Sequence, residues 1–392
     1  MKNNRTFLEK LLDGAEAEWK TIAEISNKVS SGGTPTTSNN NYYENGNIPW
    51  LRTQEVDFKE IWNTDLKITE EGLNNSSAKW IPKNCVIVAM YGATVGKIAI
   101  NKIPLTTNQA CANIEVNPEI AHYRYVFHYL MSKYEYIKSL GSGSQTNINS
   151  QIVKKIRIPI PPLSVQTEIV KILDALTALT SELTSELTLR RKQYEYYREK
   201  LLSEEELGKV GFEWKPLGEV TNIKTGQAVS KYSISQNPGI YPVINSGREP
   251  LGFINEWNTE NDPIGITTRG AGVGSITWQE GKYFRGNLNY SVTVKSDYKL
   301  NIRFLYHILL HFQKEIHNLC SFTGIPALNA SELKKLEISI PAIEEQQRIV
   351  SILDKFEDLT NSITEGLPLA IEQSQERYEY YRELLLNFPG RE

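Results

Sequence analysis

Residues 160–174 read IPPLSVQTEIVKILD, and residues 340–354 read IPAIEEQQRIVSILD, a shift of 180 positions. A second pair, QYEYYREKLL at 193–202 and RYEYYRELLL at 377–386, repeats with a shift of 184 positions. Self-similarity at a fixed spacing indicates a chain built from repeated structural units. We therefore infer an internal duplication, with four extra residues in the second copy between these two landmarks.

Fainter matches extend the duplication into the rest of the chain. YGATVGKIAI at 91–100 aligns with RGAGVGSITW at 269–278, whereas the stretches between such anchors differ widely. FLEKLLDG at 7–14 resembles REKLLSEE at 198–205, so the chain begins where the repeat unit ends. This circular order predicts neighbouring termini, a pseudo-two-fold axis, and packing of residues 1–17 with the helical repeats.

Both landmark pairs lie in helical patterns. Apolar residues from Ile169 to Leu201, and again from Ile349 to Leu385, recur in alternating steps of four and three, which predicts coiled-coil helices. Ser164 is the expected N-cap of the first helix, and the extra residues near Gly366 should kink or break the second. The two helices are expected to pack antiparallel as a spacer.

A four-residue tandem repeat, TSELTSEL, occupies residues 180–187 inside the first helical segment. One added unit would lengthen a helix by roughly 6 Å, compared with 3.4 Å per base pair of DNA. The repeat favours a helix that acts as a ruler, meaning that its length sets a distance along DNA. A helical pair that only closes the fold is also compatible with the pattern.

The remaining sequence forms two globular segments of mixed α/β character. Short β-rich runs include CVIVAMYG (85–92), GKIAI (96–100), PIGITTRG (263–270) and YSVTVK (290–295), and one helix per segment is expected near 119–138 and 301–319. The predicted fold is α+β, with two similar domains separated by two long antiparallel helices. The predicted division is 1–159 (first domain), 160–206 (central helical repeat), 207–340 (second domain) and 341–392 (C-terminal helical repeat).

The net charge of −3 hides a division along the chain. Residues 21–159 carry 14 Lys and Arg against 11 Asp and Glu, and residues 215–340 carry 13 against 10, so each segment is +3. The helical segments are acidic, with 7 against 10 in residues 160–214 and 5 against 11 in residues 341–392. Phosphate contacts supply much of the affinity of DNA-binding proteins, so contact with DNA is expected in the two positive segments.

Polar and basic residues in glycine-rich loops are the best candidates for such contacts, because backbone can approach phosphate there and Asn, Gln or Arg can reach base edges. Arginine recognises guanine through two hydrogen bonds, which favours Arg52, Arg269 and Arg285. Ordinary surface or turn chemistry is the alternative for each. The other candidates in the first segment are Ser31, Gly32, Thr34, Tyr91, Lys97, Asn108, Gln109, Ser144, Gln145 and Asn147. Those in the second are Lys224, Lys231, Tyr232, Asn245, Arg248, Thr268, Asn289 and Thr323.

Motifs of several other functions are incomplete or missing in this sequence. GATVGK at 92–97 is one residue short of a phosphate loop, and its counterpart GAGVGS lacks the lysine, so a tight turn between strands is expected. His307, His311, His317 and Cys320 lack an HExxH-like pattern, and aromatic helix packing is favoured over a metal site. Neither an N/D-P-P-aromatic segment nor a helicase or nuclease pattern occurs, so no catalytic residue, metal or cofactor is predicted.

Three scattered cysteines (Cys85, Cys111 and Cys320) provide no disulfide framework. No stretch approaches the roughly 18 uninterrupted apolar residues of a membrane span, and MKNNRTFLEK has no signal-peptide core. These features predict a cytoplasmic protein.

Taken together, the two variable segments, the repeated IPPLSVQTEIVKILD and IPAIEEQQRIVSILDKFEDLTNSITEGLP stretches and the TSELTSEL unit resemble the specificity subunit of type I restriction–modification systems, most closely the type IC group. The resemblance covers essentially the whole chain, and the helical segments carry most of it.

The resemblance implies more than the residues alone. Each target-recognition domain would read one half of a bipartite interrupted site in double-stranded DNA through the major groove. The helices would set the spacing and dock two methyltransferase (modification) subunits, and restriction subunits that hydrolyse ATP and cut DNA would join them. S-adenosylmethionine and ATP would belong to those partners. A protein-only scaffold and a stand-alone DNA-modifying enzyme remain the alternatives.

Overall fold

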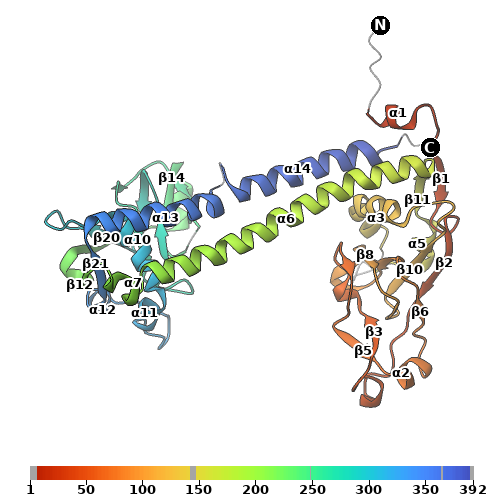
Figure 1. Cartoon of the computed structure of the whole chain (residues 1–392), viewed down its shortest axis with the longest axis horizontal. Coiled ribbons are helices and arrows are strands. Elements are labelled where there is room, and N and C mark those ends of the chain that lie inside the picture. Colours follow the sequence, from red (N-terminus) through yellow and green to blue (C-terminus); the bar gives the residue numbers. More distant parts are fainter. Residues whose placement is uncertain (1–6, 142–146, 248, 363–364, 389–392) are drawn as a thin grey trace, which may run out of the picture. The chain divides into compact units, whose positions relative to one another are not determined.

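The computed structural model describes residues 7–141, 147–247, 249–362 and 365–388 (Figure 1). The chain divides into two compact units. Unit 1 comprises Met1–Glu182 and Ile371–Glu392, and unit 2 comprises Leu183–Ala370. Each unit therefore holds one globular segment together with parts of two helical segments, and each is described by itself.

Unit 1 contains a five-stranded sheet in the order β2-β10-β7-β8-β4, a four-stranded sheet in the order β5-β3-β9-β6, and the separate pair β1-β11. The strands are β1 (Glu18–Thr21), β2 (Ser26–Ser31), β3 (Ile48–Leu51), β4 (Glu60–Ile61), β5 (Leu66–Ile68), β6 (Trp80–Ile81), β7 (Val86–Ala89), β8 (Ile98–Asn101), β9 (Leu105–Thr107), β10 (Cys111–Val116) and β11 (Arg157–Ile160). Every residue of β7 and β8 is buried, which explains their near-continuous apolar sequence.

The helices of unit 1 divide between the two sheets, because α2 packs beside the smaller sheet and the others contribute to the core of the larger one. They are α1 (Phe7–Leu12), α2 (Glu70–Asn74), α3 (Tyr123–Ser132), α4 (Tyr134–Ser139), α5 (Ser150–Lys155), the first half of α6 (Leu163–Leu201) and most of α14 (Leu367–Leu386), with short 3₁₀ turns η1 (Asn40–Tyr42), η2 (Thr53–Glu55) and η3 (Gly92–Thr94). One core joins Val88 of the sheet, Tyr125 of α3, Ile169 of α6 and Leu385 of α14. Leu8 of α1 belongs to the same core. Packing of Met1–Thr6 stays a prediction, because these residues lie outside the described part of the chain.

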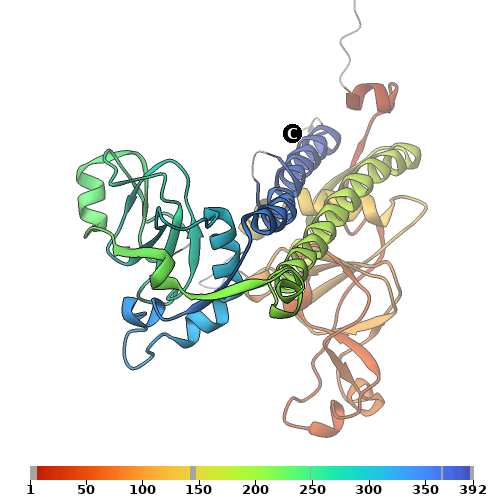
Figure 2. The same ribbon diagram turned by 60° about the vertical axis from the view of Figure 1, so that its left-hand side comes forward.

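Unit 2 repeats this plan (Figure 2). It contains two four-stranded sheets, β13-β20-β17-β18 and β15-β14-β19-β16, and the pair β12-β21. The strands are β12 (Phe212–Pro216), β13 (Thr221–Thr225), β14 (Pro238–Ile244), β15 (Phe253–Ile254), β16 (Thr259–Glu260), β17 (Ile264–Thr267), β18 (Ile276–Trp278), β19 (Lys282–Arg285), β20 (Asn289–Val294) and β21 (Glu337–Pro341). The helices are α7 (Glu204–Gly208), α8 (Leu217–Val220), α9 (Lys231–Gln236), α10 (Ile302–His311), α11 (Gln313–Asn318), α12 (Ala330–Leu333) and α13 (Ile343–Asn361), besides the second half of α6.

Two helices replace each single helix expected near 119–138 and 301–319. Lys133 separates α3 from α4, and Phe312 separates α10 from α11, both with φ and ψ near the bridge region. The same interruption in both units confirms the duplication at the level of the backbone. Ser164 is not an N-cap, because α6 already begins at Leu163 and Pro162 O accepts from the amide of Gln166.

The central helical segment is one helix of 39 residues, as the heptad pattern predicts. The C-terminal segment is two helices, α13 and α14, rather than one long helix. The break lies at the predicted place, and Gly366 (φ +90°) follows it. A Cβ on Gly366 would lie 2.7 Å from Asp358 O, so this turn requires glycine.

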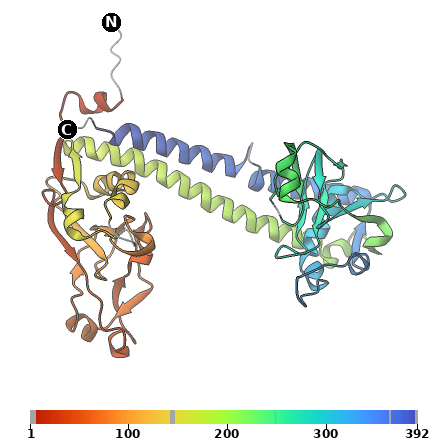
Figure 3. The same cartoon turned by 180° about the vertical axis from the view of Figure 1, so that it is seen from behind.

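Within each unit the two helical segments pack antiparallel. In unit 1 the hydroxyls of Thr180 on α6 and Ser374 on α14 lie 2.9 Å apart, and the two helices run side by side (Figure 3). In unit 2 the rings of Tyr197 on α6 and Phe356 on α13 stack with centroids 5.4 Å apart. Among the residues that the structure describes, no helix is long and apolar enough to cross a membrane.

Candidate nucleic-acid interface

A glycine turn is the most closely duplicated part of the candidate site. It joins β7 to β8 in unit 1 and β17 to β18 in unit 2. Gly92 and Gly270 open the turn with φ of +80° and +92°, and Gly96 and Gly274 close it with φ of +80° and +78°. The turn between strands predicted for GATVGK is thus confirmed.

Tyr91 and Arg269 take the equivalent exposed position at the start of this turn. The backbone around them is held in the same way, because Gly96 N donates to Ala89 O and Gly274 N donates to Thr267 O, each at 2.8 Å. The two units therefore present different side chains, one aromatic and one cationic, on one backbone.

Five candidates of unit 1 meet at the ends of β2 and β9. Gly33 N donates to Thr107 O at 2.9 Å, and a Cβ on Gly32 would lie only 1.9 Å from the same oxygen. Thr34 Oγ1 donates to Gln109 Oε1, and Asn108 N donates to Leu51 O at 2.9 Å. Glycine at position 32 thus allows a close backbone approach that places Thr34, Asn108 and Gln109 together, with Ser31 at the adjoining end of β2.

Arg52 and Lys97 lie on two turns that contact each other. Thr94 Oγ1 of η3 donates to Thr53 O of η2 at 2.8 Å. The Lys97 ammonium pairs with Asp57 at 2.7 Å, whereas Arg52 Nε lies 4.0 Å from Glu55. Lys97 therefore has a carboxylate partner that a phosphate would have to replace, whereas Arg52 Nε forms no hydrogen bond with Glu55.

Asn147 is half-buried and lies near Tyr91, because Ile148 N donates to Met90 O at 3.0 Å. Its Oδ1 finds no hydrogen-bond partner among the described residues. The candidates Ser144 and Gln145, like Arg248 of unit 2, lie outside the described residues.

In unit 2, Arg269 and Thr323 lie on adjoining loops. Arg269 forms a β-bridge with Ala327, and Gly270 N donates to Pro326 O at 3.0 Å. Thr323 is exposed in the turn between Ser321 and Ala327, whereas Thr268 is buried beneath it. The structure thus brings together two exposed candidates, Arg269 and Thr323.

The remaining exposed candidates of unit 2 lie elsewhere. Lys231 and Tyr232 open the short helix α9, and the Tyr232 side chain is 74% exposed. Lys224 lies on β13 at the edge of an open pocket of about 310 Å³ whose other walls include Gln227, Asn258 and Asp262.

Arg285, favoured by its residue type, is only 3% exposed. Its Nη1 donates to Ile264 O at 3.0 Å and to Asn289 Oδ1, and its Nη2 donates to the Asp262 carbonyl, both at 2.6 Å. Burial lowers the pKa of its guanidinium. Because these bonds hold β17, β19 and β20 together, Arg285 is a structural residue in this fold rather than a free donor to a base edge.

Two other candidates share the interior with Arg285. Asn289 is fully buried, and Asn245 is 7% exposed and accepts from Leu288 N at 2.9 Å through its Oδ1. Their side chains fix the loop after β19, so they support the surface from below.

Sequence reasoning passed over the exposed apolar side chains of both units. Trp62 and Trp80 are 64% and 48% exposed in unit 1, and Phe322 and Ile325 are 54% and 71% exposed beside Thr323. Single aromatic residues inside polar loops are the signal that could have found them.

A metal site finds little support. Within the described chain, His307, Asp354 and Glu357 form one group with ligand-like spacing. Arg303, however, donates to both carboxylates at 2.8 Å, so a cation already neutralises them. The three cysteines are buried, and burial raises the pKa of the Cys85 thiol to about 12, well above the range of a reactive thiolate.

Comparison with known proteins identifies the family. Residues 16–189 and 209–373 each match the type I restriction modification DNA specificity domain. A putative type I restriction enzyme specificity subunit of Haemophilus influenzae is 40% identical over 99% of this chain and 100% of its own length. The specificity subunit of the EcoprrI type I restriction enzyme of Escherichia coli is 32% identical over 92% of each chain.

Solved structures agree at the level of the fold. The specificity subunit of a type I system from M. genitalium superposes with a TM-score of 0.65 at 19% identity, covering 96% of this chain and 98% of its own. A chain from a study of complex assembly in a type I system superposes with a TM-score of 0.58 at 18% identity, covering 94% and 97%. With two matched specificity domains and relatives matched over nearly their whole length, the chain belongs to the type I restriction enzyme specificity subunits, the non-catalytic DNA-recognition subunits of these systems.

Proposed function

We propose that each unit reads one half of a bipartite, interrupted DNA site. The recognition domains are residues 1–159 and 207–340, and the helical segments 160–206 and 341–392 act as spacers. The observation that supports this most directly is the duplicated glycine turn, which presents Tyr91 in one unit and Arg269 in the other on the same backbone. A shared framework with different exposed side chains suits a protein that reads two different sequences.

The proposed DNA contacts follow from exposure and charge. Arg269 and Thr323 form the centre of the surface in unit 2, and Arg52, Tyr91 and Gln109 form that in unit 1. The further candidates for contact are Ser31, Thr34, Lys97, Asn108, Ser144, Gln145 and Asn147 in the first domain, and Lys224, Lys231, Tyr232 and Arg248 in the second. The buried Gly32, Asn245, Thr268 and Asn289 would support these surfaces from within the fold.

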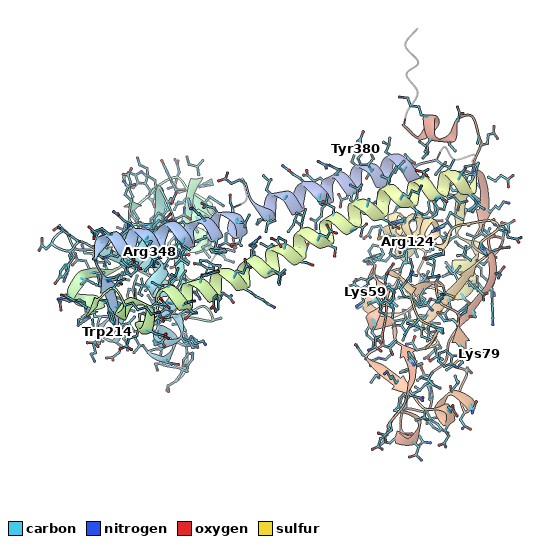
Figure 4. The ribbon with its side chains drawn as sticks, in the orientation of Figure 1. Lys59, Lys79, Arg124, Trp214, Arg348 and Tyr380 are labelled. Atoms are coloured by element: carbon cyan, nitrogen blue, oxygen red, sulfur yellow. The ribbon has the colours of Figure 1, made fainter. Side chains whose placement is uncertain are left out.

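The acidic helical segments are proposed to bind protein partners: two methyltransferase (modification) subunits, joined by restriction subunits. Tyr196 on α6 and Tyr380 on α14 occupy equivalent places in the repeat and are 59% and 63% exposed. Figure 4 shows Tyr380 on the side of α14 away from α6. Large exposed aromatics are enriched at protein interfaces, and two equivalent ones suit two copies of one partner. The TSELTSEL unit and this assembly suit the type IC group and a cytoplasmic complex.

Mapping DNA methylation tests the proposal. The chain is expressed with its modification subunit in a host without adenine methylation, and methylated adenines are located by sequencing. We expect two defined half-sites, one methylated on each strand, separated by a gap of fixed length. The control omits this chain and should give no methylation.

Three other outcomes would contradict the proposal. A continuous motif would mean that the two units do not read separate half-sites. Methylation by the chain without its partner would favour the stand-alone enzyme, and failure of the complex to bind any duplex selectively would favour the protein-only scaffold.

A further inference from the structure

A half-buried ion cluster in unit 1 joins the recognition domain to the spacer helix. Arg124 of α3 donates to both oxygens of Asp174 on α6, from Nε at 2.5 Å and from Nη2 at 2.8 Å. His128 Nε2, one turn further along α3, lies 2.7 Å from Asp174 Oδ1. Arg124 also pairs with Glu60 of β4, so one guanidinium links a strand of the sheet to the spacer (Figure 4).

Unit 2 contains the same cluster at the equivalent positions. Arg303 Nε of α10 donates to Asp354 Oδ1 of α13 at 2.8 Å, and His307 Nε2 lies 2.8 Å from the same oxygen. A second carboxylate, Glu357 of α13, accepts from Arg303 Nη2 at 2.8 Å. The pattern RxxxH on the domain helix and Asp on the spacer helix is therefore duplicated in three dimensions, and we call it the Arg–His–Asp clamp.

The clamp also reaches the second helical segment of its unit. In unit 2 the Tyr194 hydroxyl of α6 lies 3.3 Å from His307 Nδ1, so His307 touches both spacer helices. In unit 1 the equivalent Tyr378 of α14 packs against the same core as α3 and α6. Burial raises the pKa of both tyrosines to about 12, so their hydroxyls stay protonated at neutral pH.

A buried glutamine completes the attachment near the start of each spacer helix. Gln166 accepts from His122 N at 2.8 Å and donates to Pro161 O at 2.8 Å. Gln346 accepts from Asn301 N at 2.8 Å and donates to Pro341 O at 2.9 Å. Together, glutamine and clamp hold each domain helix to its spacer helix at two separate places.

This chemistry suits positioning rather than catalysis. His128 and His307 are 1% and 0% exposed, so neither can reach a substrate. Apolar packing tolerates small rotations of one helix against another, whereas a guanidinium bonded through two nitrogens specifies both distance and angle. Arg124 uses two nitrogens on Asp174, and Arg303 uses one on Asp354 and one on Glu357. Ion pairs that keep partial contact with solvent, as these do, add little to stability, so their presence at equivalent positions in both units favours a positioning role.

We propose that the Arg–His–Asp clamp fixes the angle at which each recognition domain is held on its own spacer helices, and thereby the gap length that the protein accepts between half-sites. The proposal rests on the proposed function, in which the two domains bind half-sites at a fixed separation. Arg124, His128, Asp174, Arg303, His307 and Asp354 are then positioning residues for DNA recognition, although none of them touches DNA.

The test uses the full complex with its modification subunits. Its affinity is measured for duplexes with the correct half-sites and a gap that is native, one base pair shorter or one base pair longer. For Arg303→Leu we expect the preference for the native gap to fall by about tenfold. Base changes within a half-site should remain as harmful as in the wild type. The matched control is Lys335→Ala, an exposed residue just after α12 whose ion pair with Glu332 is local and lies outside both helical segments.

The outcomes separate the possibilities. An unchanged gap preference in a folded Arg303→Leu complex would refute the proposed role of the clamp, even if the melting temperature of the variant fell. If Arg303→Leu does not fold, Arg303→Lys replaces it in the test. Lysine keeps the charge but lacks the planar guanidinium that bonds Asp354 and Glu357 through separate nitrogens, so the same loss of gap preference is expected. A wild-type complex that binds no split duplex would instead refute the proposed function.

Discussion

At the scale of single residues, exposure separates two arginines that the sequence treats alike. Arg269 is exposed on the glycine turn, whereas Arg285 is buried behind it. Arg269→Ala should weaken binding of the second half-site by about 1–3 kcal/mol, the usual contribution of a two-pronged contact to a base. Binding assays with the full complex should also show weaker discrimination at one base pair. Equal loss at every position would indicate a phosphate contact instead.

Arg285→Ala should act through stability. It removes donors to Ile264 O, Asn289 Oδ1 and Asp262 O, of which Asp262 O keeps the Tyr283 hydroxyl as a donor. Loss of the other buried hydrogen bonds should cost about 3 kcal/mol. Thermal unfolding should show a clear decrease in melting temperature, and Arg269→Ala serves as the control with little change. If the variant kept its melting temperature but lost specificity, the result would mean that Arg285 contacts DNA.

These two arginines also show where sequence reasoning stops. The residue type and the glycine-rich surroundings are alike for both, but burial depends on the pairing of β19 with β14 and β16, which no local pattern specifies. The sequence does carry a signal for the clamp, because RYVFHYL (124–130) and RFLYHIL (303–309) repeat the same Arg and His at the same spacing.

At the scale of elements, α6 is the ruler of the proposed function. Insertion of one TSEL unit after Leu187 should lengthen the gap of the methylated motif by one or two base pairs, because four helical residues add roughly 6 Å. Both half-sites should stay unchanged. Methylation mapping of the variant measures both quantities together. Altered half-sites with the original gap would refute the ruler.

The helical segments were the most predictable elements, because a heptad pattern depends on neighbouring residues only. The sequence also indicated the break near Gly366 through its four extra residues. It did not indicate the interruptions at Lys133 and Phe312, because apolar periodicity continues across both sites. Burial of Ile137 and Ile316 on the sheet, a tertiary effect, accompanies the change of direction.

At the scale of the whole molecule, the duplication predicts that each recognition domain reads its half-site independently of the other. Replacing residues 21–159 by the corresponding segment of a relative should change one half of the methylated motif and leave the other half and the gap intact. Each spacer helix and its clamp aspartate remain in place in such an exchange. Changes in both halves would mean that the units do not read DNA independently.

Acid should weaken both units in the same way. Burial alone would raise the pKa of Asp174 and Asp354, but hydrogen bonds from the clamp histidine and arginine lower the pKa of both. A carboxylate with a lowered pKa stabilises the fold above its unfolded-state pKa of about 4, and this stability is lost as the pH falls through the folded-state pKa. Unfolding measured between pH 7 and pH 3 should therefore depend less on pH in Asp174→Asn and Asp354→Asn.

The repeated clamp has a consequence for inheritance. Arg124 and His128 match Arg303 and His307, and Asp174 matches Asp354. Each recognition domain therefore carries the same Arg and His, and each spacer helix carries the Asp that binds them. The similar stretches 160–174 and 340–354, which contain these aspartates, adjoin segments that differ widely between the two copies. A gene of this design can acquire a new specificity when recombination exchanges the segment that encodes one recognition domain. The spacer helices that hold this domain need no change.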